Sequence, residues 1–178
     1  DKEKLKNAIQ HIAQRHEILR TVLEEEDGIY YQKVLNEPLI INEYNFIETD
    51  ITAQIERDIN TPFDLKNEYP IRVCFYHDRN KLLLLLNLHH ITSDGWSTDI
   101  LLREMTAFYN NQSLPTLAIQ YKDYAHWQQN QLESKTFQSQ KNFWLQKLKG
   151  EIPRLDLPSN KTRPAVYTNN GRLLSDFL

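Results

Sequence analysis

The spacing of hydrophobic residues along the chain predicts a mixture of helices and strands. Apolar residues three and four positions apart indicate helices, and this spacing occurs in residues 1–16, 52–60, 97–109, 120–132 and 137–149. Short runs rich in apolar and β-branched residues indicate strands, which we expect at residues 18–23, 29–35, 38–46, 71–76, 81–88 and 173–178. Glu-Asp-Gly at 26–28 predicts a hairpin turn. These elements predict an α/β fold in which helices pack on a mixed sheet.

Two consecutive predicted strands differ in their pattern. Ile71, Val73 and Phe75 alternate with other residues, which indicates a strand that is buried on one face only. We therefore expect Arg72 to be a surface residue of that strand. Residues 81–88 are almost continuously apolar, as expected for a strand that is covered on both faces.

Composition excludes several classes of protein. The chain has 178 residues, 40% of them apolar, and a net charge of −3 without a basic cluster, so nucleic acid is a poor candidate for a partner. The longest apolar run, Leu82 to Leu86, is too short to cross a membrane, and the first residues do not resemble a secretory signal. A single cysteine, Cys74, excludes an internal disulfide and a cysteine-based zinc site. We expect a cytoplasmic protein.

The stretch LHHITSDGWS, residues 88–97, carries the most distinctive chemistry. Strand alternation places His89 and His90 on opposite faces, so the two imidazoles cannot readily bind one metal ion, and the stretch contains no further ligand set. One histidine is expected to face the core and the other to lie exposed. An exposed histidine at a strand end suits general-base catalysis, whereas a hydrogen-bonded structural histidine fits the same pattern. The residues alone do not distinguish the two roles.

The residues near the histidines favour direct transfer over covalent catalysis. Gly95 lets the backbone approach a reacting carbonyl, and the free N–H groups of the helix that follows favour negative charge nearby. Neither Ser93 nor Ser97 lies in a GxSxG elbow, and Cys74 is expected to be a small buried residue of a strand. Direct reaction between two bound substrates therefore fits better than a covalent enzyme intermediate.

Several motifs together resemble the condensation domains of nonribosomal peptide synthetases, which share the fold of chloramphenicol acetyltransferase. HHITSDGWS is similar to their HHxxxDG signature. RHEILRTVL, from Arg15 to Leu23, resembles the RHExLRTxF motif, and YKDYAHW, from Tyr121 to Trp127, resembles YxDFAxW. PFDL at 62–65 and LPSNKTRPA at 157–165 also look like family sequence, so the resemblance covers nearly the whole chain.

The resemblance implies a role for each residue of the signature. His90 would be the active-site residue in the tunnel where two substrates meet, acting as a base or positioning the attacking amine, and His89 would be structural. Asp94 would pair with an arginine of the RHExLR motif, either Arg15, which we favour, or Arg20. Gly95 would offer its backbone amide to the thioester carbonyl. The aromatic residues of the YKDYAHW stretch are expected to be core residues of a helix rather than ligand contacts.

The resemblance also implies a function and partners. The expected reaction is amide formation between substrates that donor and acceptor carrier domains deliver on 4'-phosphopantetheine arms, with no tightly bound cofactor and with an adenylation domain nearby. Residues 1–178 correspond to the N-terminal half of such a domain, and we expect the half to be incomplete at both ends and to need the C-terminal half. The alternatives are a stand-alone acyltransferase that uses coenzyme A and a non-catalytic docking or scaffold half-domain.

Overall fold

The computed structural model describes residues 1–46, 51–79, 81–153, 158 and 165–166, and the strand expected at residues 173–178 lies outside this part. The chain forms two compact units, residues 1–133 and residues 134–178. In chain order the elements of the first unit are α1 (Lys2–Arg15), a 3₁₀ helix (Glu17–Arg20), β1 (Thr21–Glu26), β2 (Ile29–Val34), β3 (Ile41–Phe46), α2 (Thr52–Asn60), β4 (Ile71–Asp78), β5 (Lys81–Leu88), α3 (Gly95–Tyr109) and α4 (Tyr121–Leu132). The second unit contains α5 (Lys135–Lys147).

The strands of the first unit form two sheets. β1 and β2 make an antiparallel hairpin in which Glu26 faces Ile29. Both turn residues, Asp27 and Gly28, have positive φ angles of 52° and 78°, as a tight two-residue hairpin requires, and this confirms the predicted turn. The second sheet has the order β3-β4-β5. β3 runs parallel to β4, and β5 runs antiparallel to β4. The expected α/β class is thus confirmed.

The predicted strand at residues 18–23 is only partly correct. Leu19 donates its N–H to the carbonyl of His16, so the chain makes a 3₁₀ turn over Glu17–Arg20 before β1 begins. This turn buries the side chains of Leu19 and Arg20, and the strand then continues through polar residues to Glu26. Apolar spacing missed the turn because a 3₁₀ helix and a strand can both bury residues of such a short segment.

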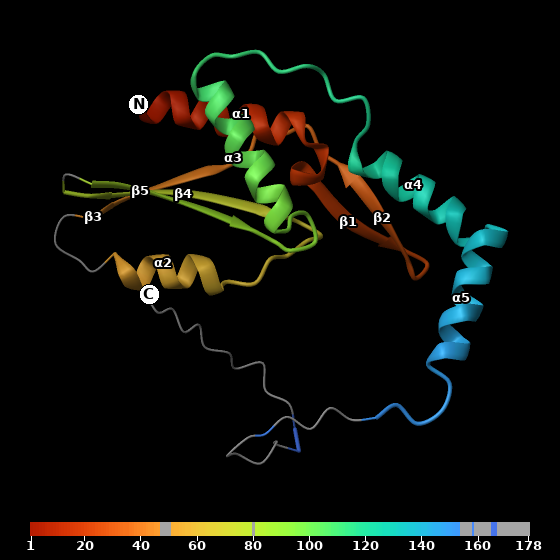
Figure 1. Cartoon of the computed structure of the whole chain (residues 1–178). Helices are drawn as coiled ribbons and strands as arrows, with labels where there is room; N and C mark the ends of the chain where they lie inside the picture. The colour runs from red at the N-terminus through yellow and green to blue at the C-terminus, as the bar shows by residue number, and fades with distance from the viewer. Residues whose placement is uncertain (47–50, 80, 154–157, 159–164, 167–178) are drawn as a thin grey trace. The chain divides into compact units, whose positions relative to one another are not determined.

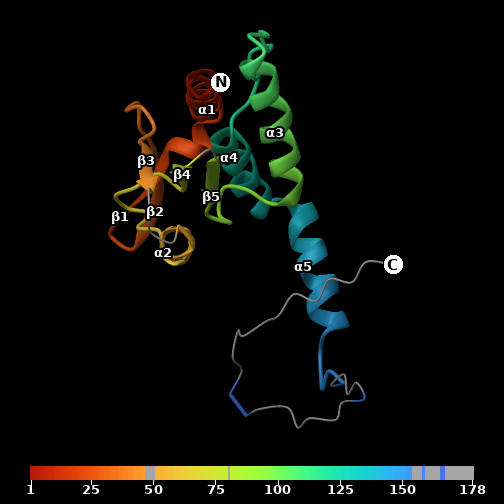
Figure 2. The ribbon, with the colours of Figure 1, turned by 90° about the vertical axis from the view of Figure 1, so that its left-hand side faces the viewer.

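Helices cover both faces of β4. α1 and α3 lie together on one face of the three-stranded sheet, and α2 lies on the opposite face (Figure 1). Figure 2 shows α3 on the side of β5. Ile9 and Ile12 of α1 pack with Val73 and Phe75 of β4 in the main core. On the other face, Tyr76 donates a hydrogen bond of 2.7 Å to Asp58 of α2.

The burial of β4 and β5 is the reverse of the prediction. Cys74 and Tyr76 are as deeply buried as Val73 and Phe75, so β4 is covered on both faces. β5 is at best half-buried, and its residues Leu82 and Leu83 are 42% and 41% exposed. The physical reason is position: β4 is the central strand, whereas β5 lies at the edge of the sheet in the part of the chain that the structure describes.

The helices expected at residues 1–16, 52–60, 97–109, 120–132 and 137–149 are confirmed, with ends that differ by up to two residues. None of the helices among the described residues is long and apolar enough to cross a membrane.

Candidate functional site

The two histidines lie in the loop that joins β5 to α3. Leu88, the last residue of β5, pairs with Ile71 at the start of β4. The backbone N–H of His89 extends this contact by donating to the carbonyl of Pro70 at 2.9 Å. Six residues later Gly95 begins α3. The loop is therefore anchored at both ends by regular structure.

His89 is half-buried and has structural contacts on its ring. Its imidazole meets the ring of Phe63 edge-on, with 5.7 Å between the ring centroids. Its Nδ1 accepts a hydrogen bond of 3.0 Å from the backbone N–H of Ile91. An acceptor nitrogen carries no proton, so the neutral ring of His89 carries its proton on Nε2.

His90 is exposed and has the opposite tautomer. Its Nδ1 lies 2.6 Å from the carbonyl oxygen of Ser93. Because a carbonyl only accepts, Nδ1 is the donor and the neutral ring has its lone pair on Nε2. Among the described residues, Nε2 of His90 has no hydrogen-bond partner. One member of the pair is exposed, as expected, whereas His89 is half-buried and lies outside the main core cluster.

Asp94 caps α3, and its expected pairing with Arg15 or Arg20 is wrong for this structure. Its carboxylate accepts from the backbone N–H of Ser97 at 2.8 Å and from the hydroxyl of Ser97 at 2.7 Å. These two hydrogen bonds hold the pKa of Asp94 below its usual value. An N-cap carboxylate at a helix start needs no cation, because the free amides of the first turn satisfy it.

Arg15 instead pairs with Glu104 of α3. Arg15 contacts the carboxylate at two points, Nε to Oε2 at 2.9 Å and Nη2 to Oε1 at 3.4 Å, and His16 adds a contact of 2.7 Å. Burial of Glu104 opposes its ionised form, but the hydrogen bonds from Arg15 and His16 outweigh this, so its pKa is lowered. Glu104 was missed in the sequence. The signal was a carboxylate on the apolar stripe of α3, between Leu101 and Phe108.

Arg20 is also buried but binds elsewhere. Its Nη1 donates to the carbonyl of Leu35 at 2.6 Å and to the side chain of Asn36 at 3.0 Å. Arg20 thus connects the start of β1 to the segment that follows β2. Neither arginine of the RHExLR motif reaches Asp94 in this structure.

Gly95 leaves open space at the first turn of α3. A side chain added at this position would meet no atom within 4 Å. The carboxylate of Asp94 accepts a hydrogen bond from the N–H of Ser97. The N–H groups of Gly95 and Trp96 have no hydrogen-bond partner among the described residues. The first turn therefore presents two unpaired amides beside the histidine loop, where a partly negative oxygen would be stabilised.

Small pockets adjoin the histidine loop. Two of them, of about 150 and 190 Å³, share the residues Ile18, Thr92 and Tyr121. One is also lined by Ser97 and the other by Ile91, so both lie against the loop and the start of α3.

The aromatic residues of α4 are not core residues in this structure, which corrects that expectation. Tyr124 and Trp127 are 43% and 54% exposed, and their rings contact each other at an interplanar angle of 37°, with 5.6 Å between the centroids. Their helix instead begins with a capping box, in which Asp123 accepts from the backbone N–H of Gln120 at 2.8 Å. The side chain of Gln120 also binds the backbone of Arg15 and Glu17, which fixes the start of α4 to the end of α1.

Cys74 is buried as expected, and burial raises the pKa of its thiol. Among the described residues, no three histidine, cysteine, aspartate or glutamate side chains form a group that could hold a metal ion.

Comparison with known proteins places these features in a family. Residues 1–175 match the model of the condensation domain family. The chain is 37% identical over 172 residues to surfactin synthase subunit 1 of Bacillus subtilis (strain 168), which covers 96% of this chain and 5% of that protein. It is 36% identical over 172 residues to tyrocidine synthase 3 of Brevibacillus parabrevis, covering 96% of this chain and 3% of that protein. The chain thus spans a small part of the curated relatives that it matches.

Solved structures show the same fold. The X-domain from teicoplanin biosynthesis matches with a TM-score of 0.77 and 27% identity, over 93% of this chain and 40% of that chain. The epimerization domain from the third module of tyrocidine synthetase B matches with a TM-score of 0.73 and 23% identity, over 90% of this chain and 40% of that chain, and supports the fold alone. The match over residues 1–175 and the identity to these synthases show that the chain belongs to the condensation domain family.

Proposed function

We propose that this chain contributes the histidine-bearing half of a site that forms amide bonds in nonribosomal peptide synthesis. The observation that carries the proposal is the arrangement of His90, an exposed imidazole whose Nδ1 is held by Ser93 and whose Nε2 has no partner among the described residues. The resemblance of residues 88–97 to the HHxxxDG signature gives this imidazole its reaction. The family membership supports the same conclusion.

The reaction joins an amine to a thioester carbonyl. The amine nitrogen of the acceptor attacks the carbonyl carbon of the donor, the carbon–sulfur bond breaks, and the sulfur leaves with the proton that the amine gives up. Nε2 of His90 accepts that proton or a hydrogen bond from the amine, because it is the basic nitrogen of the neutral ring. The products are an amide and a free thiol. The exchange of a carbon–sulfur bond for a carbon–nitrogen bond needs no oxidant or metal.

The first turn of α3 gives the developing oxyanion a place to bind. The N–H groups of Gly95 and Trp96 are unpaired within the described part of the chain, and a side chain added at Gly95 would point into open space. Preorganised N–H donors stabilise the negative oxygen of a tetrahedral intermediate, a contribution of about 3 kcal/mol for one donor in well-studied enzymes. We assign the amide of Gly95 to this role.

Four further residues support the loop. His89 fixes the loop through Phe63 and Ile91, and Asp94 starts α3 at the correct residue. Arg15 fixes α3 to α1 through Glu104, and Arg20 fixes the hairpin to the segment after β2. Their proposed role is to hold His90 and Gly95 in place without contacting substrate.

The partners follow from surfaces that this chain leaves uncovered. Tyr121, Tyr124 and Trp127 of α4 are exposed, and their rings contact one another. Leu82 and Leu83 are also exposed, on opposite faces of the edge strand β5. Clustered exposed apolar side chains are typical of surfaces that bind further protein. The solved relative is about two and a half times as long as its matched part, since the match covers 40% of it. We assign these surfaces to the C-terminal half of the domain.

Carrier domains are the proposed source of both substrates. Each carrier would deliver its acyl or aminoacyl group as a thioester on a 4'-phosphopantetheine arm, and an adenylation domain would load it. The arm is a part of the substrate in this scheme, and the chain holds no cofactor of its own.

The test uses the full-length protein that contains this chain. Donor and acceptor are loaded on carrier domains, and amide product is quantified for the wild type, for His90→Ala and for His126→Ala. His126 is an exposed histidine of α4 and serves as the matched control. Loss of product in His90→Ala alone supports the proposal. Product in all three samples contradicts the role of His90.

A parallel sample replaces the carrier-bound donor by the same acyl group on coenzyme A. Efficient reaction with the coenzyme A donor and none with the carrier-bound donor would indicate a stand-alone acyltransferase. Absence of product from either donor in the wild-type protein would indicate a docking or scaffold role.

A further inference from the structure

Arg72 of β4 is connected to the histidine loop by a continuous series of contacts. Its guanidinium lies over the ring of Phe63, with 4.0 Å between Cζ and the ring centroid. The ring of His89 also contacts Phe63 and meets it edge-on at 86°. Phe63 therefore lies between a cation and the first histidine of the signature.

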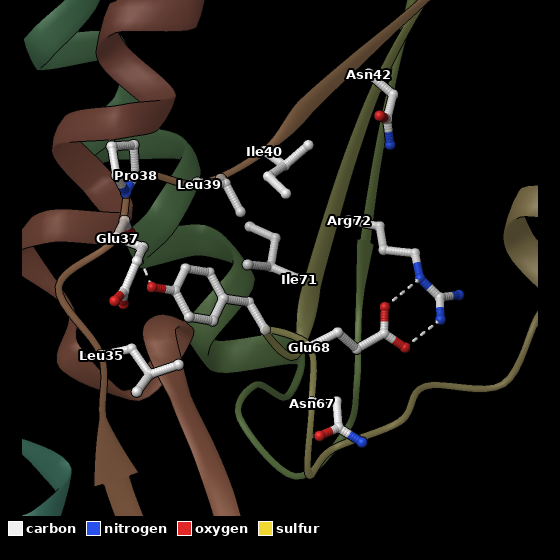
Figure 3. A pocket seen from close by; sticks show the side chains of 11 residues that line it. Leu35, Glu37, Pro38, Leu39, Ile40, Asn42, Asn67, Glu68, Ile71 and Arg72 are labelled. Carbon is white, nitrogen blue, oxygen red and sulfur yellow. Dashed lines mark hydrogen bonds and ion pairs between the residues drawn. The ribbon is translucent and has the colours of Figure 1, made fainter.

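The guanidinium of Arg72 is held in one orientation by its hydrogen bonds. Nε and Nη2 donate to the two carboxylate oxygens of Glu68 at 3.1 and 2.6 Å, the fork drawn in Figure 3. Nη1 donates to the carbonyl of Thr61 and Nη2 to the carbonyl of Pro62 at 2.6 Å. The side chain is 16% exposed. A planar fork with these partners fixes the backbone on the N-terminal side of Phe63 as well as its ring.

The contacts continue from His89 into the loop. The carbonyl of His89 accepts hydrogen bonds from both the N–H and the hydroxyl of Thr92 at 3.0 Å. The ring nitrogen Nδ1 of His89 accepts from the backbone N–H of Ile91. These bonds set the path of residues 89–92, and His90 lies inside that path. A rotation of the His89 ring would break the bond from Ile91 and change the direction of the His90 side chain.

We infer that Arg72 is a positioning residue for His90, acting through Phe63 and His89. The inference rests on the proposed function of His90, but the geometry that it describes does not. Arg72 contacts no reacting atom. Its role is to orient Phe63, so that the His89 ring keeps Nδ1 toward Ile91 and the loop keeps Nδ1 of His90 toward Ser93.

The sequence pattern predicted that Arg72 is an ordinary surface residue of a strand. A positioning role for Arg72 differs from that prediction and can be tested by substitution. Lysine at this position would keep the charge. It would lose the two-point contact with Glu68 and the planar guanidinium that lies over the Phe63 ring. Leucine at position 63 would keep an apolar side chain but would lose the ring that contacts both Arg72 and His89. Tyrosine at position 63 would keep the ring.

The first measurement records the tautomers of the histidine rings by long-range hydrogen–nitrogen NMR spectra. The wild-type chain is expected to show His89 protonated on Nε2 and His90 protonated on Nδ1. In Arg72→Lys and in Phe63→Leu, the signals of both rings are expected to move toward the tautomer-averaged position. Phe63→Tyr is expected to keep the wild-type pattern. Arg57→Lys, on the exposed face of α2, is the matched control.

The second measurement is amide formation by the same variants in the full-length protein. We expect kcat to fall about tenfold in Arg72→Lys with KM unchanged, because a displaced catalytic group weakens the transition state and not substrate binding. Phe63→Tyr should retain most of the activity.

Wild-type ring signals in both Arg72→Lys and Phe63→Leu would overturn the inference. If Arg72→Lys does not fold, Phe63→Leu decides the question alone. If the ring signals change as expected while His90→Ala retains full activity, Arg72 positions the loop but the proposed role of His90 fails. If His90→Ala is inactive and the ring signals do not change, only the inference about Arg72 fails.

Discussion

Arg15 and Glu104 form a two-point ion pair between the end of α1 and the middle of α3, with a shortest distance of 2.9 Å. Both side chains are 12% exposed. The pair fixes the helix whose first turn carries Gly95. It therefore provides the brace that the sequence resemblance assigned to Asp94, but at a position ten residues further along α3.

Removing the carboxylate should destabilise the chain measurably. Glu104→Gln leaves the guanidinium of Arg15 partly buried without its counter-charge, so we expect the free energy of unfolding to fall by about 2 kcal/mol. Urea unfolding followed by circular dichroism measures this. Glu3→Gln is the control, because Glu3 is 71% exposed and its loss should change the free energy by less than about 0.5 kcal/mol. Equal effects of the two variants would contradict the assignment.

Two substitutions at Asp94 distinguish a helix cap from an ion pair. Asparagine caps helices about as well as aspartate, whereas alanine has no side-chain acceptor. We therefore expect Asp94→Asn to keep the unfolding midpoint close to that of the wild type and Asp94→Ala to lower it. If Asp94→Asn is as destabilised as Asp94→Ala, the negative charge itself is required. That result would contradict the capping role and support an ion pair between Asp94 and an arginine.

Stability should depend on Glu43 at acidic pH. Hydrogen bonds from Lys2, Lys6 and His77 lower the pKa of Glu43 from 4.5 to about 2. A lowered pKa contributes stability that is fully present above pH 4.5 and is lost as the pH falls toward 2. The free energy of unfolding should therefore decrease less steeply across this window in Glu43→Gln than in the wild type. Parallel pH profiles of the two proteins would show that the cluster of cations has no effect on stability.

The thiol of Cys74 should report on the docking of α2. Cys74 is 1% exposed and lies on the face of β4 that α2 covers, so its reaction with a thiol reagent requires local opening. Tyr76→Phe removes the hydrogen bond to Asp58 and should speed the reaction about tenfold. Tyr44→Phe is the control, because the Tyr44 ring stacks on Tyr76 but its hydroxyl has no hydrogen-bond partner among the described residues. Equal reaction rates in the two variants would contradict the role of the Tyr76 hydroxyl.

The sequence pattern predicted the positions of helices and strands better than it predicted their burial. Apolar periodicity located α2, and the Glu-Asp-Gly sequence located the hairpin turn at Asp27 and Gly28, because both features depend on neighbouring residues alone. It reversed the burial of β4 and β5. Burial of a strand depends on its place in the sheet, and no local pattern records that Cys74 faces α2 while Leu82 lies at an edge.

The candidate site was predicted in part for a similar reason. Strand alternation separated His89 from His90, and the structure gives them opposite tautomers through Ile91 and Ser93. The partners of Arg15 were not predictable from spacing, since Glu104 lies 89 residues away in the chain. The strand pattern predicts a surface position for Arg72, because it records which face a side chain uses and not what packs on that face.

The role of His90 is measured most sharply by the rate of a single turnover with donor and acceptor already loaded on their carriers. Under these conditions loading and carrier exchange no longer limit the reaction, so the rate reports on the step that His90 serves. We expect His90→Ala to lower this rate by about a hundredfold or more, the usual contribution of a positioned acid–base group, and His126→Ala to leave it unchanged. A rate in His90→Ala within about twofold of the wild type would contradict the role of His90.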